Sequence, residues 1–374
     1  MEPVLKRGLA EWDQALLPRD EFEARVRVVR AELERQGLEA LAIVNYSVLG
    51  NLGDYSSFAY LAGMQSGGAL VVSLEGDPTM ISFGGGREMA FIRTQTWIED
   101  IRVGGANAFA VMRDVLGERG IKVGKIGTVG VDGMPAARIQ DFDKAFNGCD
   151  LKAFDSSFSQ IKLSKRPREI LAIGAALNIA RNAAAAGLET FTKGGSNLDA
   201  MLAAEEAARV GRARDVRILA NTGGDQLRPF ENSPHDRHSS LLLWVAVQYQ
   251  GYWAEAVVTS PEAKGNPADA ALDAMKGKAS AGAKISEIAK AALAKLRPDA
   301  RETALSYGLG NMIGLSLDEG VEIHPDSDQV LVDGTVLSLR VFAKDAEVAD
   351  FQTSLLEVTA DGVKPVQPVA LSGA

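Results

Sequence analysis

The chain has 374 residues, of which 46% are hydrophobic and 24% charged, and its formal net charge is −9. These values are typical of a soluble globular protein that forms two domains or one large one. Its single cysteine excludes an internal disulfide and a cysteine-based zinc site, and its three histidines argue against a histidine-rich metal site. The negative charge argues against a nucleic-acid-binding surface, which needs clustered Lys and Arg.

The N-terminal stretch MEPVLKRGLAEWDQALLPRDEFEARV carries charges where a signal peptide needs an apolar core. No apolar run approaches the roughly 20 residues of a membrane span. We therefore expect a cytoplasmic protein that binds neither membranes nor nucleic acid. Its partner is expected to be a small molecule or a peptide.

The first half of the chain alternates predicted helices and strands. Residues 20–38 have apolar positions at helical spacing, and the segment EALAIVNYS that follows is typical of a buried strand. Residues 67–83 predict a hairpin, and residues 124–133 predict a further strand followed by a helix. These elements indicate a first α/β domain of residues 1–160.

The second half begins with a long alanine-rich helix over residues 164–191, which has a serine as its expected cap and a proline in its first turn. A second helix is predicted from Ser196, and the chain then becomes rich in β-strands. A helix pair follows through residues 267–296, and short strands alternate with glycine turns from Tyr307 onward. We expect residues 161–374 to form the second domain.

One predicted hairpin, WVAVQYQGYWAEAVVT at residues 244–259, has an unusual composition. Two β-rich runs meet near Gln250-Gly251, and the hairpin carries two tryptophans and a single carboxylate. Because strand side chains alternate between faces, Trp253 and Glu255 are expected on the same face. The function of this lone acid depends on what the rest of the chain resembles.

Several further segments in both halves of the chain are distinctive in their order and spacing. They are VRVVRAELERQGLEALAI with FAYLAG at 58–63, SKRPREILAIGAA, YQGYWAEAVVT at 249–259, IGLSLDEGVEI at 313–323 and LVDGTVLSL at 331–339. Together they resemble the creatinase, prolidase and aminopeptidase P superfamily. The resemblance covers nearly the whole chain. It implies an α/β (α+β) protein with a creatinase-type N-terminal domain and a C-terminal pita-bread domain, assembled as a homodimer.

Metal-dependent members of this superfamily bind two divalent ions through two aspartates, one histidine and two glutamates. Hard cations prefer such ligands, and a bridging hydroxide can attack an amide carbon. The matching positions here are, in order, Trp244, Glu255, Asn311, Arg340 and Thr353 or Ser354. One carboxylate remains, and a cation stands where an anion is required. The resemblance therefore implies no metal and no other cofactor, as in creatinase.

The substituted positions suggest roles for five side chains. Glu255 could be a general acid or base, or only the structural ion-pair partner of Arg340. Arg340 could recognise a substrate carboxylate or stabilise an oxyanion or enolate. Asn311 could orient a substrate carbonyl or be a structural amide. Trp244 and Trp253 could shape a water-poor pocket or belong to the core.

Other candidates come from loops and from the last ligand position. His235 lies close to where creatinase keeps its catalytic histidine, although it could equally be a surface residue. Counting back the family's usual distance from the first ligand position gives Leu227 or Arg228, so Arg228 is a candidate substrate contact. Asp318 could act as a proton shuttle or be a solvated turn residue. Thr353 is the remaining candidate for substrate binding.

We therefore expect a metal-independent enzyme that acts on a small carboxylated or polar molecule, with C–N bond hydrolysis as the favoured reaction. A lyase that performs C–C cleavage or decarboxylation on the same scaffold is an alternative. A non-catalytic protein that binds a peptide or protein in the pita-bread groove is another. A working metallopeptidase would require several of the matched positions to be misaligned at once.

Overall fold

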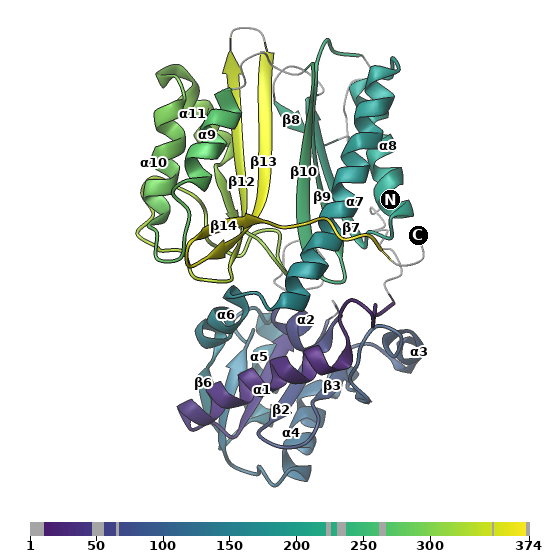
Figure 1. The fold of residues 1–374 in the computed structure, drawn as a ribbon. Helices are drawn as coiled ribbons and strands as arrows, with labels where there is room; N and C mark the ends of the chain where they lie inside the picture. Colours follow the sequence, from purple (N-terminus) through teal and green to yellow (C-terminus); the bar gives the residue numbers. More distant parts are fainter. Residues whose placement is uncertain are drawn as a thin grey trace. The chain divides into compact units, whose positions relative to one another are not determined.

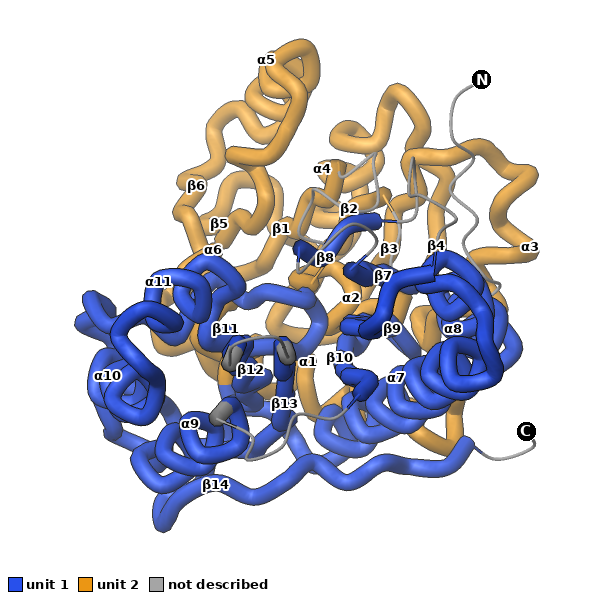
Figure 2. Tube along the Cα trace, turned by 90° about the horizontal axis from the view of Figure 1, so that it is seen from above, with its two compact units in different colours: residues 1–10, 164–374 blue, residues 11–163 orange. Residues whose placement is uncertain are grey.

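The protein folds into two compact units, coloured separately in Figure 2. Unit 2 contains residues 11–163, and unit 1 contains the described part of residues 164–374. The boundary lies close to the expected position at 160/161. The structure, a computed structural model, describes residues 11–46, 56–64, 67–221, 226–229, 237–261, 267–345 and 348–371.

Unit 2 is built on a mixed sheet whose strands follow the order β4-β3-β2-β1-β5-β6. β1 pairs antiparallel with β2 and parallel with β5, as in an α/β domain that also contains a hairpin. The strands are β1 (Ala40–Asn45), β2 (Gly68–Ser73), β3 (Thr79–Ser82), β4 (Asp100–Val103), β5 (Lys125–Val129) and β6 (Asp150–Ala153).

The helices of unit 2 cover this sheet, and α4 packs on β2 and β3. Its apolar face, with Phe109 and Met112, joins Phe142 and Phe146 of the next helical region in a buried cluster. The helices are α1 (Arg19–Gln36), α2 (Ser56–Ala62), α3 (Met89–Ile92), α4 (Ala108–Glu118), α5 (Ala136–Ala145) and α6 (Asp155–Leu163), with 3₁₀ turns η1 (Gly86–Glu88) and η2 (Gly105–Asn107).

Unit 1 contains two antiparallel sheets, of strand order β10-β9-β7-β8 and β11-β12-β13-β14, and β10 packs beside β13 where they meet (Figure 1). The first sheet contains β7 (Asp215–Asn221), β8 (Leu227–Arg228), β9 (Leu241–Tyr249) and β10 (Tyr252–Ser260). The second contains β11 (Gly310–Met312), β12 (Val336–Asp345), β13 (Val348–Thr359) and β14 (Gly362–Pro365). β12 and β13 are long, whereas the glycine-rich sequence predicted only short strands.

Helices pack on both sheets of unit 1. α7 packs on β9, β10 and α8, while α9 and α11 pack on the second sheet. The helices are α7 (Pro167–Thr192), α8 (Asn197–Val210), α9 (Pro267–Lys276), α10 (Ile285–Lys295) and α11 (Pro298–Tyr307). The sequence predicted a helix pair in this region, and α11 is a third helix.

The start of α7 differs from the expected serine cap. The helix begins at Pro167, and the Glu169 side chain accepts a hydrogen bond from the backbone N–H of Arg166 at 3.0 Å. α8 begins as predicted, because the Ser196 hydroxyl accepts a hydrogen bond from the backbone N–H of Asp199. The Glu169 carboxylate, rather than the Ser164 hydroxyl, therefore accepts the hydrogen bond from the free backbone N–H at the start of the helix.

α7 is long and apolar enough to cross a membrane by length and composition, although the sequence indicated no run of this kind. Of its most apolar window, 61% is buried within the protein, against the strands and helix named above. A buried core helix of a globular unit passes the same test. The packing accounts for its apolar composition.

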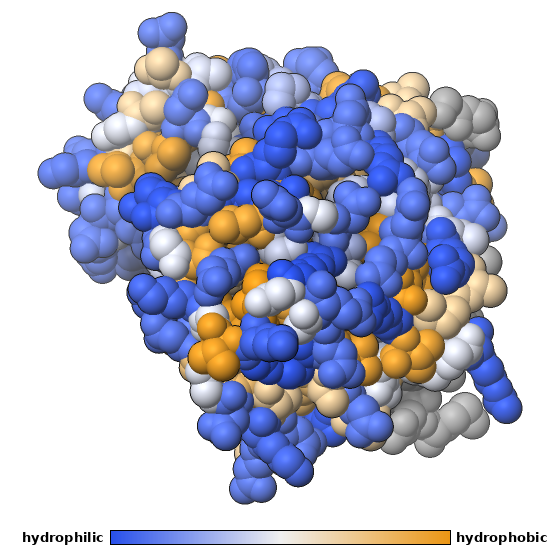
Figure 3. Space-filling view, turned by 90° about the horizontal axis from the view of Figure 1, so that it is seen from below, coloured by the Kyte–Doolittle hydropathy of each residue, from blue (hydrophilic) through white to orange (hydrophobic). Residues whose placement is uncertain are grey.

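The exposed surface carries large apolar side chains singly. Figure 3 shows a face on which hydrophilic side chains cover most of the area and apolar ones form small separated groups. Phe91, Val123 and Val210 are among the exposed apolar residues, and they come from distant parts of the sequence. Scattered exposure of this kind is usual for a globular protein.

Candidate functional site

The β9–β10 hairpin turns at the predicted dipeptide. Gln250 and Gly251 have φ angles of 49° and 88°, the two positive values that a type I′ turn requires. The turn fixes the register in which Trp244 pairs with Val257, so that Glu255 becomes the diagonal neighbour of Trp244 on the same face. The sequence therefore places an indole and a carboxylate together by turn geometry.

Glu255 is completely buried and is held by three side chains. The indole Nε1 of Trp244 donates to Oε2 at 2.7 Å, and the Ser338 hydroxyl donates to Oε1. Nη1 of Arg340 lies 3.0 Å from Oε2 and 3.2 Å from Oε1, which makes a close ion pair. The Glu255 side chain is 0% exposed and that of Arg340 is 17% exposed. Both carboxylate oxygens thus have donors, as a buried anion requires.

Asn311 holds the other side of the guanidinium. Nη2 of Arg340 donates to Oδ1 of Asn311 at 2.6 Å, and Nδ2 of Asn311 donates to the carbonyls of Met312 and Leu317 at 2.9 and 2.8 Å. Asn311 pairs with Ser338 across β11 and β12, so both lie on the face that carries Arg340. The amide is oriented by the backbone and in turn orients the guanidinium.

The approach of β11 to β12 depends on glycine. Gly310 has a φ of 121°, and a Cβ added there would lie 2.1 Å from the carbonyl oxygen of Ser338. Only glycine fits this conformation and this close contact. Gly310 therefore allows β11 to lie close to β12, and this brings the side-chain amide of Asn311 within reach of Arg340.

A salt bridge fixes the loop that contains the Leu317 carbonyl. Nζ of Lys165 lies 2.5 Å from Oε2 of Glu319, with side-chain exposures of 1% and 13%. Oε1 of Glu319 also accepts from the backbone N–H of Leu315 at 3.2 Å. The segment before α7 is thereby tied to the loop that orients Asn311.

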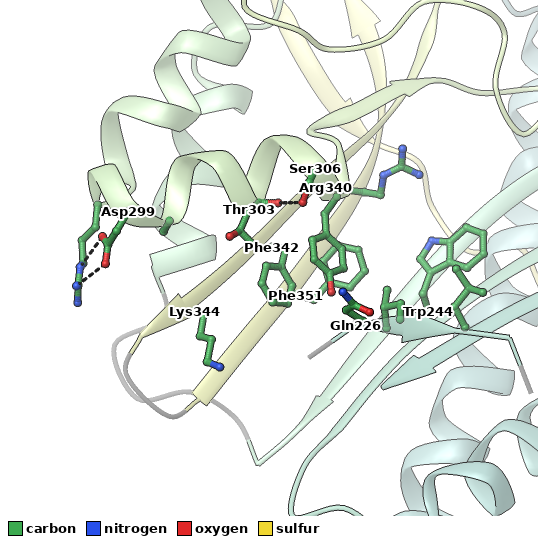
Figure 4. A pocket seen from close by; sticks show the side chains of 14 residues that line it. Gln226, Trp244, Asp299, Thr303, Ser306, Arg340, Phe342, Lys344 and Phe351 are labelled. Atoms are coloured by element: carbon green, nitrogen blue, oxygen red, sulfur yellow. Dashed lines mark hydrogen bonds and ion pairs between the residues drawn. The ribbon is translucent and has the colours of Figure 1, made fainter. Parts of the chain in front are cut away.

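The Arg340 side chain lines a pocket of about 1010 Å³ within unit 1, which Figure 4 shows from close by. Its walls come from β12 and β13, from α11 with the residue before it, and from β7, β8 and β9 with the segment before β8. A pocket of this size can hold a small molecule or a short peptide.

Charged side chains on the pocket wall are mainly cationic. Arg297, Arg340 and Lys344 line it together with one acid, Asp299. Arg297 and Asp299 form an exposed ion pair of 2.7 Å, and the Arg297 guanidinium holds the pKa of Asp299 below its usual value. Arg340 is likewise paired with Glu255, so the wall offers N–H donors suited to an anionic ligand rather than a large net positive charge.

Three aromatic rings form the apolar wall beside Arg340. Tyr307 and Phe342 are stacked with their centroids 4.1 Å apart, and Phe351 meets them edge-on at 6.0 and 6.2 Å. All three line the pocket. This wall was not predicted from the sequence, although the proline at the start of α11 and the alternation of Arg340 with Phe342 on one strand were available signals.

The other predicted residues lie outside the pocket lining. Trp253 is buried, and the guanidinium of Arg217 stacks 4.7 Å from its ring centroid. Thr353 pairs with Arg340 across β12 and β13 and so shares its face, but it is not a lining residue. Arg228 is exposed and pairs with Ala220, whereas its neighbour Leu227, the other position reached by counting, lines the pocket.

The two candidate proton-transfer residues in loops have different outcomes. Asp318 is exposed, and its Oδ1 accepts the backbone N–H of Gly320 at 2.8 Å, which is a contact within the turn. His235 lies outside the described residues. Of the three proposed catalytic side chains, the described residues bring only Glu255 into the network with Arg340.

The residues at the matched metal positions do not fit a pair of divalent ions. Trp244 offers an N–H donor, Arg340 is a cation, and Oδ1 of Asn311 already accepts from Arg340. Glu255 is the one carboxylate, and its oxygens are occupied. Within the described ranges, no three His, Cys, Asp or Glu side chains are grouped as ligands. Divalent cations need several free oxygen ligands, which this set lacks.

Comparison with solved structures shows the same fold in peptidases. X-Pro aminopeptidase from Thermotoga maritima is 17% identical with a TM-score of 0.72, over 92% of this chain and 98% of that one. The prolidase from Pyrococcus horikoshii is 18% identical with a TM-score of 0.70, over 93% and 99%. The expected pita-bread fold with its N-terminal α/β domain is therefore confirmed.

The fold is not restricted to proteins named as peptidases. The N-terminal domain of the FACT complex subunit SPT16 from chickpea is 17% identical with a TM-score of 0.64, over 96% of both chains. No family model matches the sequence, and no curated protein matches it. At these identities the likeness establishes the fold, and the reaction must be inferred from the side chains.

Proposed function

From a pita-bread fold whose matched metal positions hold an ion pair, we propose that this protein binds and acts on a small carboxylated molecule without a metal ion. The observation that carries the proposal is the guanidinium of Arg340 at the pocket wall, already balanced by Glu255. The guanidinium supplies a positive charge at the pocket wall, so no metal ion is needed there to attract a carboxylate. Arginine is well suited to carboxylates because its planar fork donates parallel hydrogen bonds.

Arg340 retains donors for a ligand. A guanidinium has five N–H groups, and the contacts to Glu255 and Asn311 use at most three of them. Nε of Arg340 has no hydrogen-bond partner among the described residues, but this atom is buried in the protein, so a ligand in the pocket would meet the Nη atoms. A second N–H on Nη2 is also left over. A ligand carboxylate could therefore bind without displacing Glu255.

Hydrolysis of a C–N bond is the favoured reaction, by analogy with the fold. Water adds to the carbon and the leaving nitrogen takes up a proton, so a group must move that proton. Glu255 would first have to lose one of its three partners. His235 is the remaining candidate from the sequence for this step. Lyase chemistry would use Arg340 in another way, to stabilise an enolate.

Non-catalytic binding is the second candidate, and one observation favours it. The donors around Glu255 satisfy both of its oxygens, which is the pattern of a structural ion pair rather than of a free base. A fold shared with a FACT complex subunit is compatible with this alternative. The pocket would then bind a carboxylated peptide or metabolite unchanged.

Metal content by mass spectrometry, paired with thermal denaturation in chelator and in excess manganese, tests the first part of the proposal. We expect no stoichiometric metal and a melting temperature that neither addition changes. Two metals per chain, with a lower melting temperature in chelator, would refute the proposal and place the protein with the metallopeptidases.

Calorimetric titration with a panel of carboxylates tests binding. The double variant Glu255→Gln/Arg340→Met removes both charges and leaves no unpaired ion, and we expect it to lose carboxylate binding. Lys290→Ala, on an exposed face of α10, is the control. Incubation of bound ligands followed by mass spectrometry separates the reactions: gain of water indicates hydrolysis, loss of carbon dioxide indicates a lyase, and no change indicates a binding protein.

A further inference from the structure

Two cations lie on the same face of one pocket strand. Arg340, Phe342 and Lys344 alternate along β12, and all three line the pocket. Four residues of extended strand place the Cα atoms of Arg340 and Lys344 about 13 Å apart. We infer that the ligand is an elongated molecule with an anionic group at each end and an apolar segment between them. This inference rests on the proposed function and narrows its ligand class.

The wall between the two cations is apolar. Phe342 separates them on the strand, Phe351 pairs with it across the sheet, and Tyr307 stacks on it. Figure 4 shows Phe342 and Phe351 between the Arg340 and Lys344 side chains, which leave the strand toward different ends of the pocket. A charged group beside these rings would lose water without gaining a partner. An apolar or planar segment would instead bury surface against them.

The two ends differ in their surroundings. Arg340 is largely buried and is held by Glu255 and Asn311, so the inner anion meets a fixed, partly desolvated guanidinium. Lys344 is exposed, so the outer anion meets an amine that is in contact with water. The inner contact therefore supplies most of the affinity, and the outer contact selects for length.

Calorimetric titration with α,ω-dicarboxylates from succinate to dodecanedioate tests this inference. The monomethyl ester of each acid is its matched control, because it keeps the length and removes one charge. We expect affinity to peak at an intermediate length, where the diacid binds about two- to fivefold tighter than its ester, as for an exposed ion pair. Lys344→Ala should abolish that preference, and Lys290→Ala should retain it.

The possible results separate this inference from the proposed function. Equal binding of diacids and monoesters, lost in Glu255→Gln/Arg340→Met, would overturn the two-ended ligand and leave the carboxylate site intact. A diacid preference that survives Lys344→Ala would also overturn it, because the second anion would then bind elsewhere. Failure of all mono- and dicarboxylates to bind would refute the proposed function itself.

Discussion

Replacing Arg340 by methionine would remove the only cation that contacts the Glu255 carboxylate among the described residues. That carboxylate is 0% exposed, so water cannot replace the guanidinium. Breaking a buried ion pair from one side costs about 3–5 kcal/mol. In a unit of about 200 residues, each kcal/mol lowers the melting temperature by about 2–4 °C, which predicts a fall of about 6–20 °C.

The double variant Glu255→Gln/Arg340→Met separates the contribution of the two charges to stability from that of side-chain packing. It removes both ions and keeps similar volumes, so we expect its stability to return to within about 2 kcal/mol of the wild type. Arg297→Met is the matched control, because it breaks an exposed ion pair with Asp299 and should cost less than about 1 kcal/mol.

Thermal and urea denaturation, followed by circular dichroism and tryptophan fluorescence, measures all of these variants. With the single variant Glu255→Gln included, we expect the double variant to be much less destabilised than the sum of the two single effects, since each single variant leaves an unpaired group. If Arg340→Met melts within about 2 °C of the wild type, or if the double variant equals the sum of the singles, the ion pair does not have the burial described here.

Three further substitutions test the surroundings of the pair. Gly310→Ala should destabilise the protein by more than about 3 kcal/mol in urea denaturation, because the φ of 121° and a contact of 2.1 Å to a backbone carbonyl leave no room for a Cβ. An unchanged urea midpoint would exclude the close approach of β11 to β12. Lys165→Met should lower the free energy of unfolding by about 3–5 kcal/mol because it leaves the Glu319 carboxylate without its cation, and Lys165→Met/Glu319→Leu should recover most of that loss in the same assay. A double variant as unstable as the single variant would contradict a charge effect. Trp244→Phe should cost about 1–3 kcal/mol through one lost hydrogen bond to Glu255, and thermal melts that match the wild type would show that the indole N–H makes no such bond.

Local sequence patterns predicted much of the fold because each depends on neighbouring residues. The β9–β10 turn required positive φ angles, and the dipeptide Gln250-Gly251 supplied them. The resemblance also placed Trp244, Glu255, Asn311 and Arg340 together, although they lie up to 96 positions apart in the printed sequence, and the structure brings all four into one network.

Contacts that depend on tertiary packing were not predictable in the same way. Nothing near Ser338 in the sequence marks it as a donor to Glu255, because that contact arises only where the two sheets of unit 1 meet. Lys165 and Glu319 each lie in a segment that carries the resemblance, but they are 154 positions apart in the sequence, and neither segment indicates that the two side chains meet. The aromatic wall required α11, a helix whose weakly amphipathic sequence did not separate it from the preceding pair.

The buried ion pair between Glu255 and Arg340 makes this site hard to convert into a metal site by single substitutions. Arg340→Glu alone would set two carboxylates side by side in a buried position, where the neighbouring indole of Trp244 supplies an N–H donor and no metal ligand. Such a substitution would leave a buried, uncompensated charge. Substitutions at the pocket walls do not carry this cost, because they leave the ion pair intact.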